Sequence, residues 1–141
     1  MEENLILIKT IFEHHIPFNQ YLGFQMMALE TGYAQMRVPF RVEYVGEKRE
    51  NRIHGGLLLT ALDAVGGAAA STTLRLHLDK IATIDLRADF LSPGQAEDVI
   101  VEAKVKKSGN RIVFVEMWAY HPSQPETHLA EGRATYSVKR L

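Results

Sequence analysis

One stretch of this sequence limits what the chain can fold into more than any other. Residues 53–71 read IHGGLLLTALDAVGGAAAS, so a glycine pair, Gly55 and Gly56, opens a run that is almost wholly apolar or small and holds one carboxylate, Asp63. As a membrane span this run would be at the short limit, and a charge with several glycines makes a span still less favourable. We therefore expect a buried helix that begins at the glycine pair, and no membrane insertion.

The remaining chain has the patterns of one short helix, one polar loop and six strands. Apolar residues at helical spacing from Leu5 to Ile16, followed by Pro17, predict a short covering helix over residues 3–15. The polar residues 41–52 are expected to form a solvated loop. Period-two patterns bounded by turn residues predict six strands, at 24–30, 33–40, 81–91, 99–107, 111–121 and 129–139.

The separation of the helices from the strands, with hairpin-length connections in the second half, indicates an α+β fold. We expect about six antiparallel strands wrapped around one long central helix, in a single domain over residues 1–141. In the strand over 81–91, one face is expected to be buried and consists of Ile84, Leu86, Ala88 and Phe90, opposite Thr83, Asp85, Arg87 and Asp89.

Composition removes several classes of function. The 141 residues include no cysteine, which excludes disulfides, thiolate zinc sites and cysteine nucleophiles. The net charge of -1 gives no overall field that would attract nucleic acid. The six histidines, His77 among them, have no metal-ligand spacing, so no metal site is expected. The N-terminus is acidic and Lys9 interrupts its apolar run, unlike a secretory signal, so a cytoplasmic location is expected.

The glycine pair gives the start of the central helix a chemical use. The first N–H groups of a helix have no partner inside it, and glycine lets another group approach them closely. This end can therefore hold an anion or polarise a carbonyl. The alternative is that Gly55 and Gly56 only allow the loop to enter tightly. His54 can orient this loop or donate a bond to a ligand, or it can serve as a helix cap.

Asp63 lies eight residues beyond Gly55, which is about 12 Å along a helix axis. A base and an oxyanion donor that act on one carbonyl must reach the same few ångströms, so one helix cannot readily supply both. Two antiparallel copies of the helix across a two-fold axis can, and we predict a symmetric dimer with two equivalent sites. The alternative is a structural carboxylate that a neighbouring strand or helix satisfies.

Two motifs at this spacing resemble a known family. The sequence resembles the hotdog-fold thioesterases of the phenylacetate-degradation (PaaI-like) group in His54-Gly55-Gly56 followed by Leu62-Asp63-Ala64. The next strand supports the resemblance with Thr83-Ile84-Asp85-Leu86 and Phe90-Leu91-Ser92-Pro93. The likeness covers nearly the whole chain. It implies a hotdog fold and hydrolysis of an acyl-CoA thioester in a site shared by the two subunits of a homodimer, or of a dimer of dimers. No cofactor is implied beyond the coenzyme A of the substrate.

The resemblance also implies roles for residues. The backbone N–H of Gly55 or Gly56 polarises the thioester carbonyl, and Asp63 of the partner subunit activates water or attacks directly. Thr83 helps to orient the water. The chain departs from the family at one place, because relatives commonly carry Asn or Gln where this sequence has Glu47 and Lys48; Asn51 is the candidate replacement. This departure keeps open a second function, a non-catalytic acyl-CoA binding or sensing protein. A hydratase or dehydratase is a third, but its paired histidine motif is not found.

Substrate binding needs both cations and apolar surface. The phosphates of coenzyme A require cations at the mouth of the site. Two clusters qualify, although surface solubility also explains them: Lys48, Arg49 and Arg52 before the helix, and Lys104, Lys106, Lys107 and Arg111 around a hairpin. The acyl group is expected in an apolar channel between subunits, where the candidate lining residues are Tyr21, Phe24 and Leu59.

Overall fold

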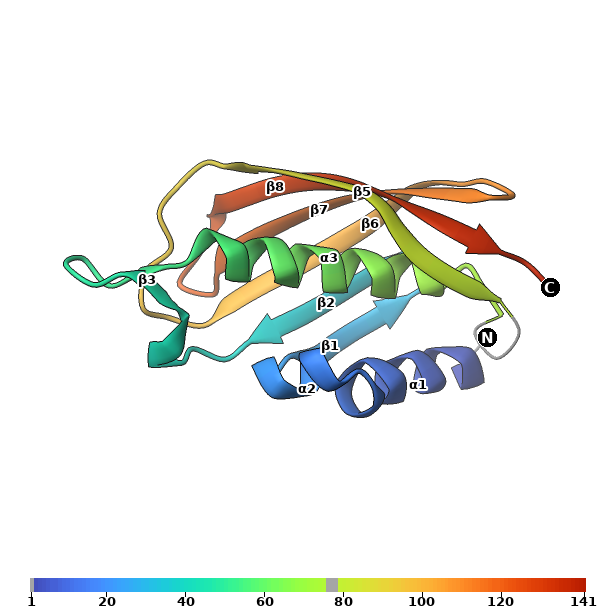
Figure 1. The fold of residues 1–141 in the computed structure, drawn as a ribbon, viewed down its shortest axis with the longest axis horizontal. Coiled ribbons are helices and arrows are strands. Elements are labelled where there is room, and N and C mark those ends of the chain that lie inside the picture. Colours follow the sequence, from blue (N-terminus) through green and yellow to red (C-terminus); the bar gives the residue numbers. More distant parts are fainter. Residues whose placement is uncertain (1, 76–78) are drawn as a thin grey trace.

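A six-stranded antiparallel sheet curls around one long helix, α3 (Figure 1). The structure is a computed structural model that describes residues 2–75 and 79–141. His77, one of the six histidines considered above, lies outside the described residues. The helices are α1 Glu2–Thr10, α2 Pro17–Leu22 and α3 Gly55–Ser71, with a π-helical turn η1 Ile11–His15 and a 3-10 turn η2 Val42–Tyr44. The strands are β1 Gln25–Glu30, β2 Tyr33–Val38, β3 Val45–Glu47, β4 Arg52–Ile53, β5 Lys80–Phe90, β6 Val99–Ser108, β7 Ile112–His121 and β8 Gln124–Lys139.

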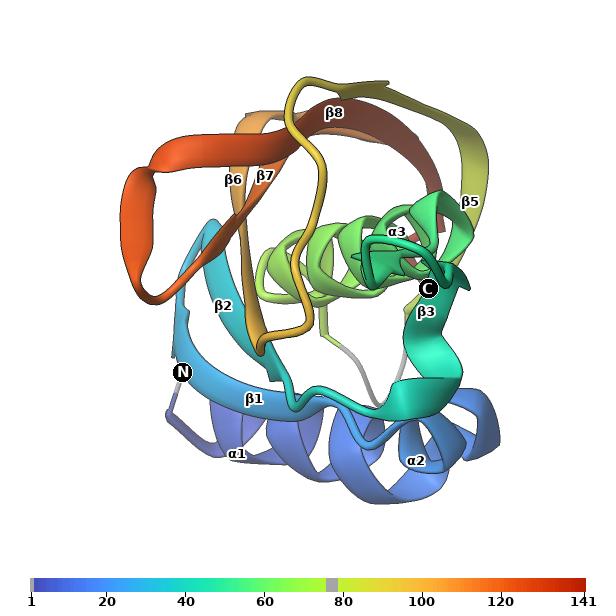
Figure 2. The same ribbon diagram turned by 90° about the vertical axis from the view of Figure 1, so that its left-hand side faces the viewer.

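The order of the strands in the large sheet is β1-β2-β6-β7-β8-β5, and β3 pairs separately with β4. Seen end-on, the sheet passes below, beside and above α3, so that the helix lies inside the curl (Figure 2). This arrangement confirms the predicted α+β hotdog architecture, with β5 and β1 as the two edge strands. None of the helices among the described residues has the length and hydropathy needed to cross a membrane.

The core forms because α3 and the inner faces of the strands are both apolar. Leu62 and Val65 of α3 are fully buried, and the strands present every second residue to them, as the period-two pattern predicts. The inward residues of β2, β6 and β7 are almost completely buried: Ala34, Met36, Val38, Val99, Val101, Ala103, Val113, Val115, Met117 and Ala119.

The N-terminal segment is helical over a longer range than predicted. After α1 and η1 the chain is extended at Ile16, and Pro17 then starts α2 as its first residue. A proline is favourable there because the first N–H of a helix has no partner in the helix. The carboxylate of Glu13 accepts a hydrogen bond of 2.8 Å from the backbone N–H of Met26, which joins this segment to β1. Figure 2 shows α1 and α2 as a layer outside β1.

Strand β5 differs from its prediction. A bulge interrupts its pairing with β8 between Thr83 and Asp85, so Thr83 and Leu86 both lie on the inner side of the strand and Ile84 is 56% exposed. The prediction that Ile84 is buried was therefore wrong. Phe90 does lie opposite the inward Ala130, but it is 54% exposed because it is at the end of an edge strand.

Residues 41–52 are not a plain solvated loop. They contain η2 and the small β3–β4 hairpin, and their hydrogen bonds fix the start of α3. The N–H of His54 donates to the carbonyl of Tyr44 at 2.8 Å, and the N–H of Ile53 donates to the carbonyl of Gly94 at 3.0 Å. The buried Tyr44 in turn donates its hydroxyl to the carbonyl of Leu22. The two residues before the glycine pair are thus fixed by hydrogen bonds to two different segments, one at Tyr44 and one at Gly94.

Strand β8 begins at Gln124, earlier than the predicted Leu129, and it includes Pro125. Its pairing with β5 reaches only as far as Ala130, so the first part of β8 has a neighbour on one side, β7. A proline lacks the N–H that a central strand would need, and is tolerated where one side of the strand is unpaired.

The packing of α3 on β8 gives a test at two adjacent glycines. A Cβ on Gly66 would lie 2.4 Å from the Tyr136 hydroxyl and 2.5 Å from Met117 Cε, whereas a Cβ on Gly67 would have its nearest neighbour, Tyr136 Cε1, at 3.7 Å. We expect Gly66→Ala to lower the free energy of unfolding by about 1–3 kcal/mol. Gly67→Ala is the control and should raise it by up to about 1 kcal/mol through helix propensity. Urea denaturation measures both, and equal effects would contradict this packing.

Candidate active site

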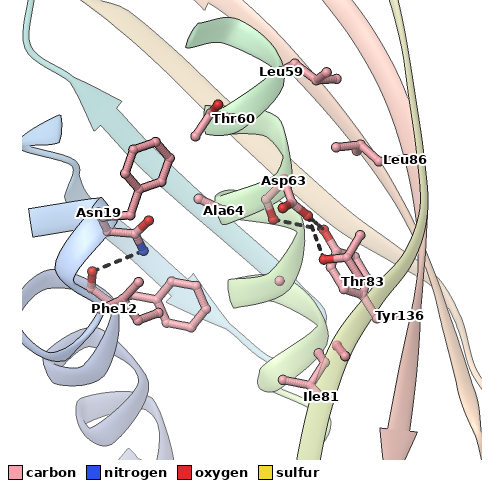
Figure 3. Close-up of a pocket in the computed structure, with 14 residues that line it drawn as sticks. Phe12, Asn19, Leu59, Thr60, Asp63, Ala64, Ile81, Thr83, Leu86 and Tyr136 are labelled. Atoms are coloured by element: carbon pink, nitrogen blue, oxygen red, sulfur yellow. Dashed lines mark hydrogen bonds between the residues drawn. The ribbon is translucent and has the colours of Figure 1, made fainter. Parts of the chain in front are cut away.

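Asp63 projects from α3 into a hollow of about 450 Å³ (Figure 3). The N-terminal helical segment forms one wall and β5 forms the other, with α3 between them. Leu59, Ala64 and Leu86 are among the apolar residues of the lining, and among the described residues no lysine or arginine contributes to it. The hollow therefore offers an apolar surface with one carboxylate part-way along it.

Two hydroxyl groups hold one oxygen of the Asp63 carboxylate. Thr83 donates to Oδ1 at 2.9 Å, and the hydroxyl of Tyr136 lies 2.9 Å from the Asp63 backbone carbonyl and 3.3 Å from Oδ1 (Figure 3). Within the described residues, Oδ2 has no hydrogen-bond partner. One carboxylate oxygen is thus oriented and the other is left for a water molecule or a substrate.

Tyr136 stays protonated in this position. Burial is the main reason that the pKa of its phenol is raised far above the usual range, and the charge of Asp63 raises it further. The hydroxyl is therefore a hydrogen-bond donor at neutral pH. Tyr136 was missed in the sequence interpretation; the available signal was a tyrosine on the inward face of a strand, whose hydroxyl needs a buried partner.

The backbone N–H groups in the first turn of α3 differ in whether they have a hydrogen-bond acceptor. His54 is the N-cap, and its Nδ1 accepts a hydrogen bond of 2.8 Å from the N–H of Gly56. The N–H groups of Leu57 and Leu58 reach the carbonyl of His54 at 3.1 and 3.5 Å. In the described part of the chain, this leaves the N–H of Gly55 without an acceptor. Of the two predicted glycine donors, Gly55 is the one available to a ligand.

Gly55 and Asp63 do not share a hollow in one chain. Gly55 lines a separate hollow of about 380 Å³ with Arg52, Leu58 and Phe90, and none of the residues that the structure describes lines both this hollow and that of Asp63. The geometry of the single chain thus agrees with the axial separation calculated from the sequence.

The remaining predicted site residues are spread over the molecule. Leu59 lines the Asp63 hollow, but Phe24 is buried elsewhere in the core and Tyr21 is 75% exposed. Arg52 forms an ion pair with Glu50.

The β3–β4 hairpin and the β6–β7 turn, which carry the two cation clusters, lie at opposite ends of the molecule (Figure 1). Lys48, Arg49 and Arg52 belong to the β3–β4 hairpin, while the second cluster is on β6 and the β6–β7 turn, at Lys104, Lys106, Lys107 and Arg111. Lys106 forms an ion pair of 3.0 Å with Glu116. Asn51 occupies a left-handed backbone conformation, with φ of 53°, in the hairpin turn, which asparagine tolerates better than most residues. No three His, Asp or Glu side chains of the described residues are placed to hold a metal ion.

Comparison with known proteins identifies the family. The model of the thioesterase superfamily matches residues 50–127, which contain Gly55, Asp63 and Thr83. The chain belongs to the thioesterase superfamily. The matched part ends before Tyr136 and begins after the N-terminal helices, so the family match does not cover the whole lining of the Asp63 hollow.

Individual proteins are similar to this one over nearly the whole chain. The medium/long-chain acyl-CoA thioesterase YigI of Escherichia coli K12 is 29% identical over 149 aligned residues, which cover 97% of this chain and 95% of YigI. A thioesterase-superfamily-related structure from Shewanella oneidensis has a TM-score of 0.86 at 28% identity, covering 98% and 97% of the two chains. A phenylacetic acid degradation-related protein from Ralstonia eutropha shares the fold, with a TM-score of 0.79 at 18% identity over 92% and 98% of the chains.

Proposed function

We propose that this protein is an acyl-CoA thioesterase whose base or nucleophile is Asp63. The observation that carries the proposal is the arrangement of this carboxylate, with one oxygen held by Thr83 and Tyr136 and the other open to an apolar hollow. Membership of the thioesterase superfamily and the similarity to YigI, a medium/long-chain acyl-CoA thioesterase, support the substrate class.

Hydrolysis needs a water oxygen on the acyl carbon and a proton on the leaving thiolate. The free Oδ2 of Asp63 takes the proton of the attacking water and returns it to the sulfur of coenzyme A as the C–S bond breaks. In the alternative, Oδ2 attacks the acyl carbon directly, and the C–S bond breaks to release the thiolate of coenzyme A as a mixed anhydride forms. Water then cleaves the anhydride, which frees the acid and the Asp63 carboxylate and supplies the proton that the thiolate takes up. In both cases the bond from Thr83 keeps the carboxylate in one orientation.

Negative charge builds on the thioester oxygen when the acyl carbon is attacked. The N–H of Gly55 is suited to stabilise this charge because it has no acceptor in the described chain and lies at the positive end of the α3 dipole. His54 contributes indirectly. By accepting the N–H of Gly56, its ring fixes the first turn of the helix around Gly55.

The site requires two subunits. Gly55 and Asp63 belong to separate hollows, and β5 is an edge strand that has β8 on one side only. Along β5, Thr83 lies against Asp63, and the Phe90 ring lies 3.4 Å from the Cβ position of Gly55, so the strand and the helix run in opposite directions. Antiparallel pairing of two β5 strands about an axis near Leu86 brings Gly55 of the partner subunit towards Asp63.

The hairpin cations are the better candidates for the phosphates of coenzyme A. Arg52 lines the hollow of Gly55, and Lys48 and Arg49 precede it on the same hairpin. This hairpin leads directly into the first turn of α3, whereas the β6–β7 turn with the second cluster lies at the opposite end of the molecule (Figure 1). Cations near the mouth of a site attract a polyanionic substrate without entering the apolar part.

Asp63→Asn tests the base. The amide has the size of the carboxylate but cannot take a proton from water, so we expect kcat to fall by on the order of a hundredfold or more, with the melting temperature nearly unchanged. Release of coenzyme A thiol measures the rate. The matched control is Glu126→Gln, an exposed carboxylate on β8 outside the hollow, which should leave activity intact. Full activity of Asp63→Asn would refute the assignment, and tight acyl-CoA binding by a wild type that releases no thiol would favour the sensing function.

Gly55→Pro tests the oxyanion donor. Proline removes one N–H group and suits the first position of a helix, and the extended His54, with ψ of 130°, is compatible with a following proline. We expect kcat to fall by about a hundredfold, as for the loss of one oxyanion donor elsewhere. Gly55→Ala is the control because it keeps the N–H and its Cβ fits at 3.4 Å from Phe90. If both variants lose activity equally, the N–H is not the active group.

A further inference from the structure

His121, the last residue of β7, is a buried histidine that lines neither the hollow of Asp63 nor that of Gly55. Its Nε2 accepts a hydrogen bond of 2.8 Å from the backbone N–H of Gln95, and its Nδ1 lies 2.8 Å from the carbonyl oxygen of Asp98. An N–H can only donate and a carbonyl oxygen can only accept, so these partners assign the hydrogen of a neutral ring to Nδ1. One side chain thus satisfies two backbone groups of another segment.

That segment is the loop of residues 91–98, which joins β5 to β6. Figure 2 shows the loop, in yellow, crossing the end of the molecule at which α3 begins. Of residues 91–97 only Gly94 is buried, so the loop is held mainly by hydrogen bonds and not by apolar packing. Two N–H groups at its β5 end donate to the carbonyl of Leu129. His121 holds the middle of the loop and its β6 end.

The middle of the loop contacts the chain that leads into α3. The carbonyl of Gly94, the residue before Gln95, accepts the N–H of Ile53 at 3.0 Å. A Cβ on Gly94 would lie only 3.1 Å from the Cβ of Ile53, so the two segments are in close contact. Gly94 and Ile53 both line the hollow of Gly55, and Ile53 is two residues before Gly55. A short series of contacts therefore connects the His121 ring with the N–H of Gly55.

We propose that His121 is a positioning residue for the oxyanion donor. Through Gln95 it fixes Gly94, and through the hydrogen bond between Gly94 and Ile53 it fixes the chain that enters the first turn of α3. A donor aimed at a developing oxyanion loses much of its effect when it is displaced by about an ångström. The inference rests on the proposed thioesterase function, in which the N–H of Gly55 stabilises the charge on the thioester oxygen.

Two polar substitutions separate the two hydrogen bonds of the ring. In His121→Gln the amide oxygen is the same number of bonds from Cβ as Nε2, so it can still accept the N–H of Gln95. In His121→Asn the amide nitrogen takes the place of Nδ1 and can donate to Asp98, but the bond to Gln95 is lost. We expect kcat and kcat/KM of His121→Asn to fall by about tenfold with KM nearly unchanged, and His121→Gln to stay within about threefold of wild type.

Release of coenzyme A thiol measures these rates, and melting temperatures establish folding. The matched control is His128→Asn, on β8 and outside both hollows, which should leave kcat unchanged. If His121→Asn does not fold, Gln95→Pro carries the same test, because it removes the same hydrogen bond from the exposed loop. It should then show the tenfold loss.

A double substitution shows whether His121 acts through Gly55. Gly55→Pro has already lost the N–H, so His121→Asn should lower kcat no further in that background, whereas general damage would lower it again by the same factor. The inference is overturned, and the thioesterase function stands, if the two effects multiply, if the Asn and Gln variants are equally impaired, or if neither is impaired. A wild type inactive on every acyl-CoA overturns the proposed function, and this inference with it.

Discussion

The close approach of β8 to α3 at Gly66 is the contact on which the candidate site depends. It lets the hydroxyl of Tyr136 reach the backbone carbonyl of Asp63 and one oxygen of its carboxylate. The same contact lets an otherwise apolar helix carry a charged residue at the border of the core, because the carboxylate has donors on its inner side and space on its outer side. A side chain at position 66 would meet the Tyr136 hydroxyl and would have to displace it, so the carboxylate would lose one of its two hydroxyl donors.

α3 also gives the physical reason why the proposed site is divided between two chains. A helix offers free N–H groups only at its first turn, whereas the carboxylate must lie far enough along the helix for the β8 tyrosine and the β5 threonine to reach it. These two requirements separate Gly55 from Asp63 along the axis. The edge strand β5, interrupted by its bulge and left without a neighbour on one side, is the surface through which a second copy can bring the two ends together.

Much of this could be predicted from the sequence. The helix over Gly55–Ser71 and the strands of the sheet follow from local periodicity. The spacing of Gly55 and Asp63 predicts a site shared between two subunits, and this stays a prediction. What could not be predicted depends on tertiary pairing. The β5 bulge turns Ile84 outward, and nothing in the local pattern marks it. Tyr136 is distant from Asp63 in sequence, so its role becomes visible only when β8 is placed on α3. The sequence also does not show which glycine has a free N–H group, because this depends on the His54 ring, which accepts the N–H of Gly56.

The central claim is that Gly55 of one subunit and Asp63 of the other form one active site, and a mixing experiment tests it most directly. Gly55→Pro and Asp63→Asn subunits are combined in equal amounts, dissociated and allowed to reassociate. Random pairing makes half of the dimers hybrids, and each hybrid has one intact site of its two, so roughly a quarter of the wild-type activity should return. If both groups acted within one chain, every site would keep one defect. No recovery in confirmed hybrid dimers would contradict the account.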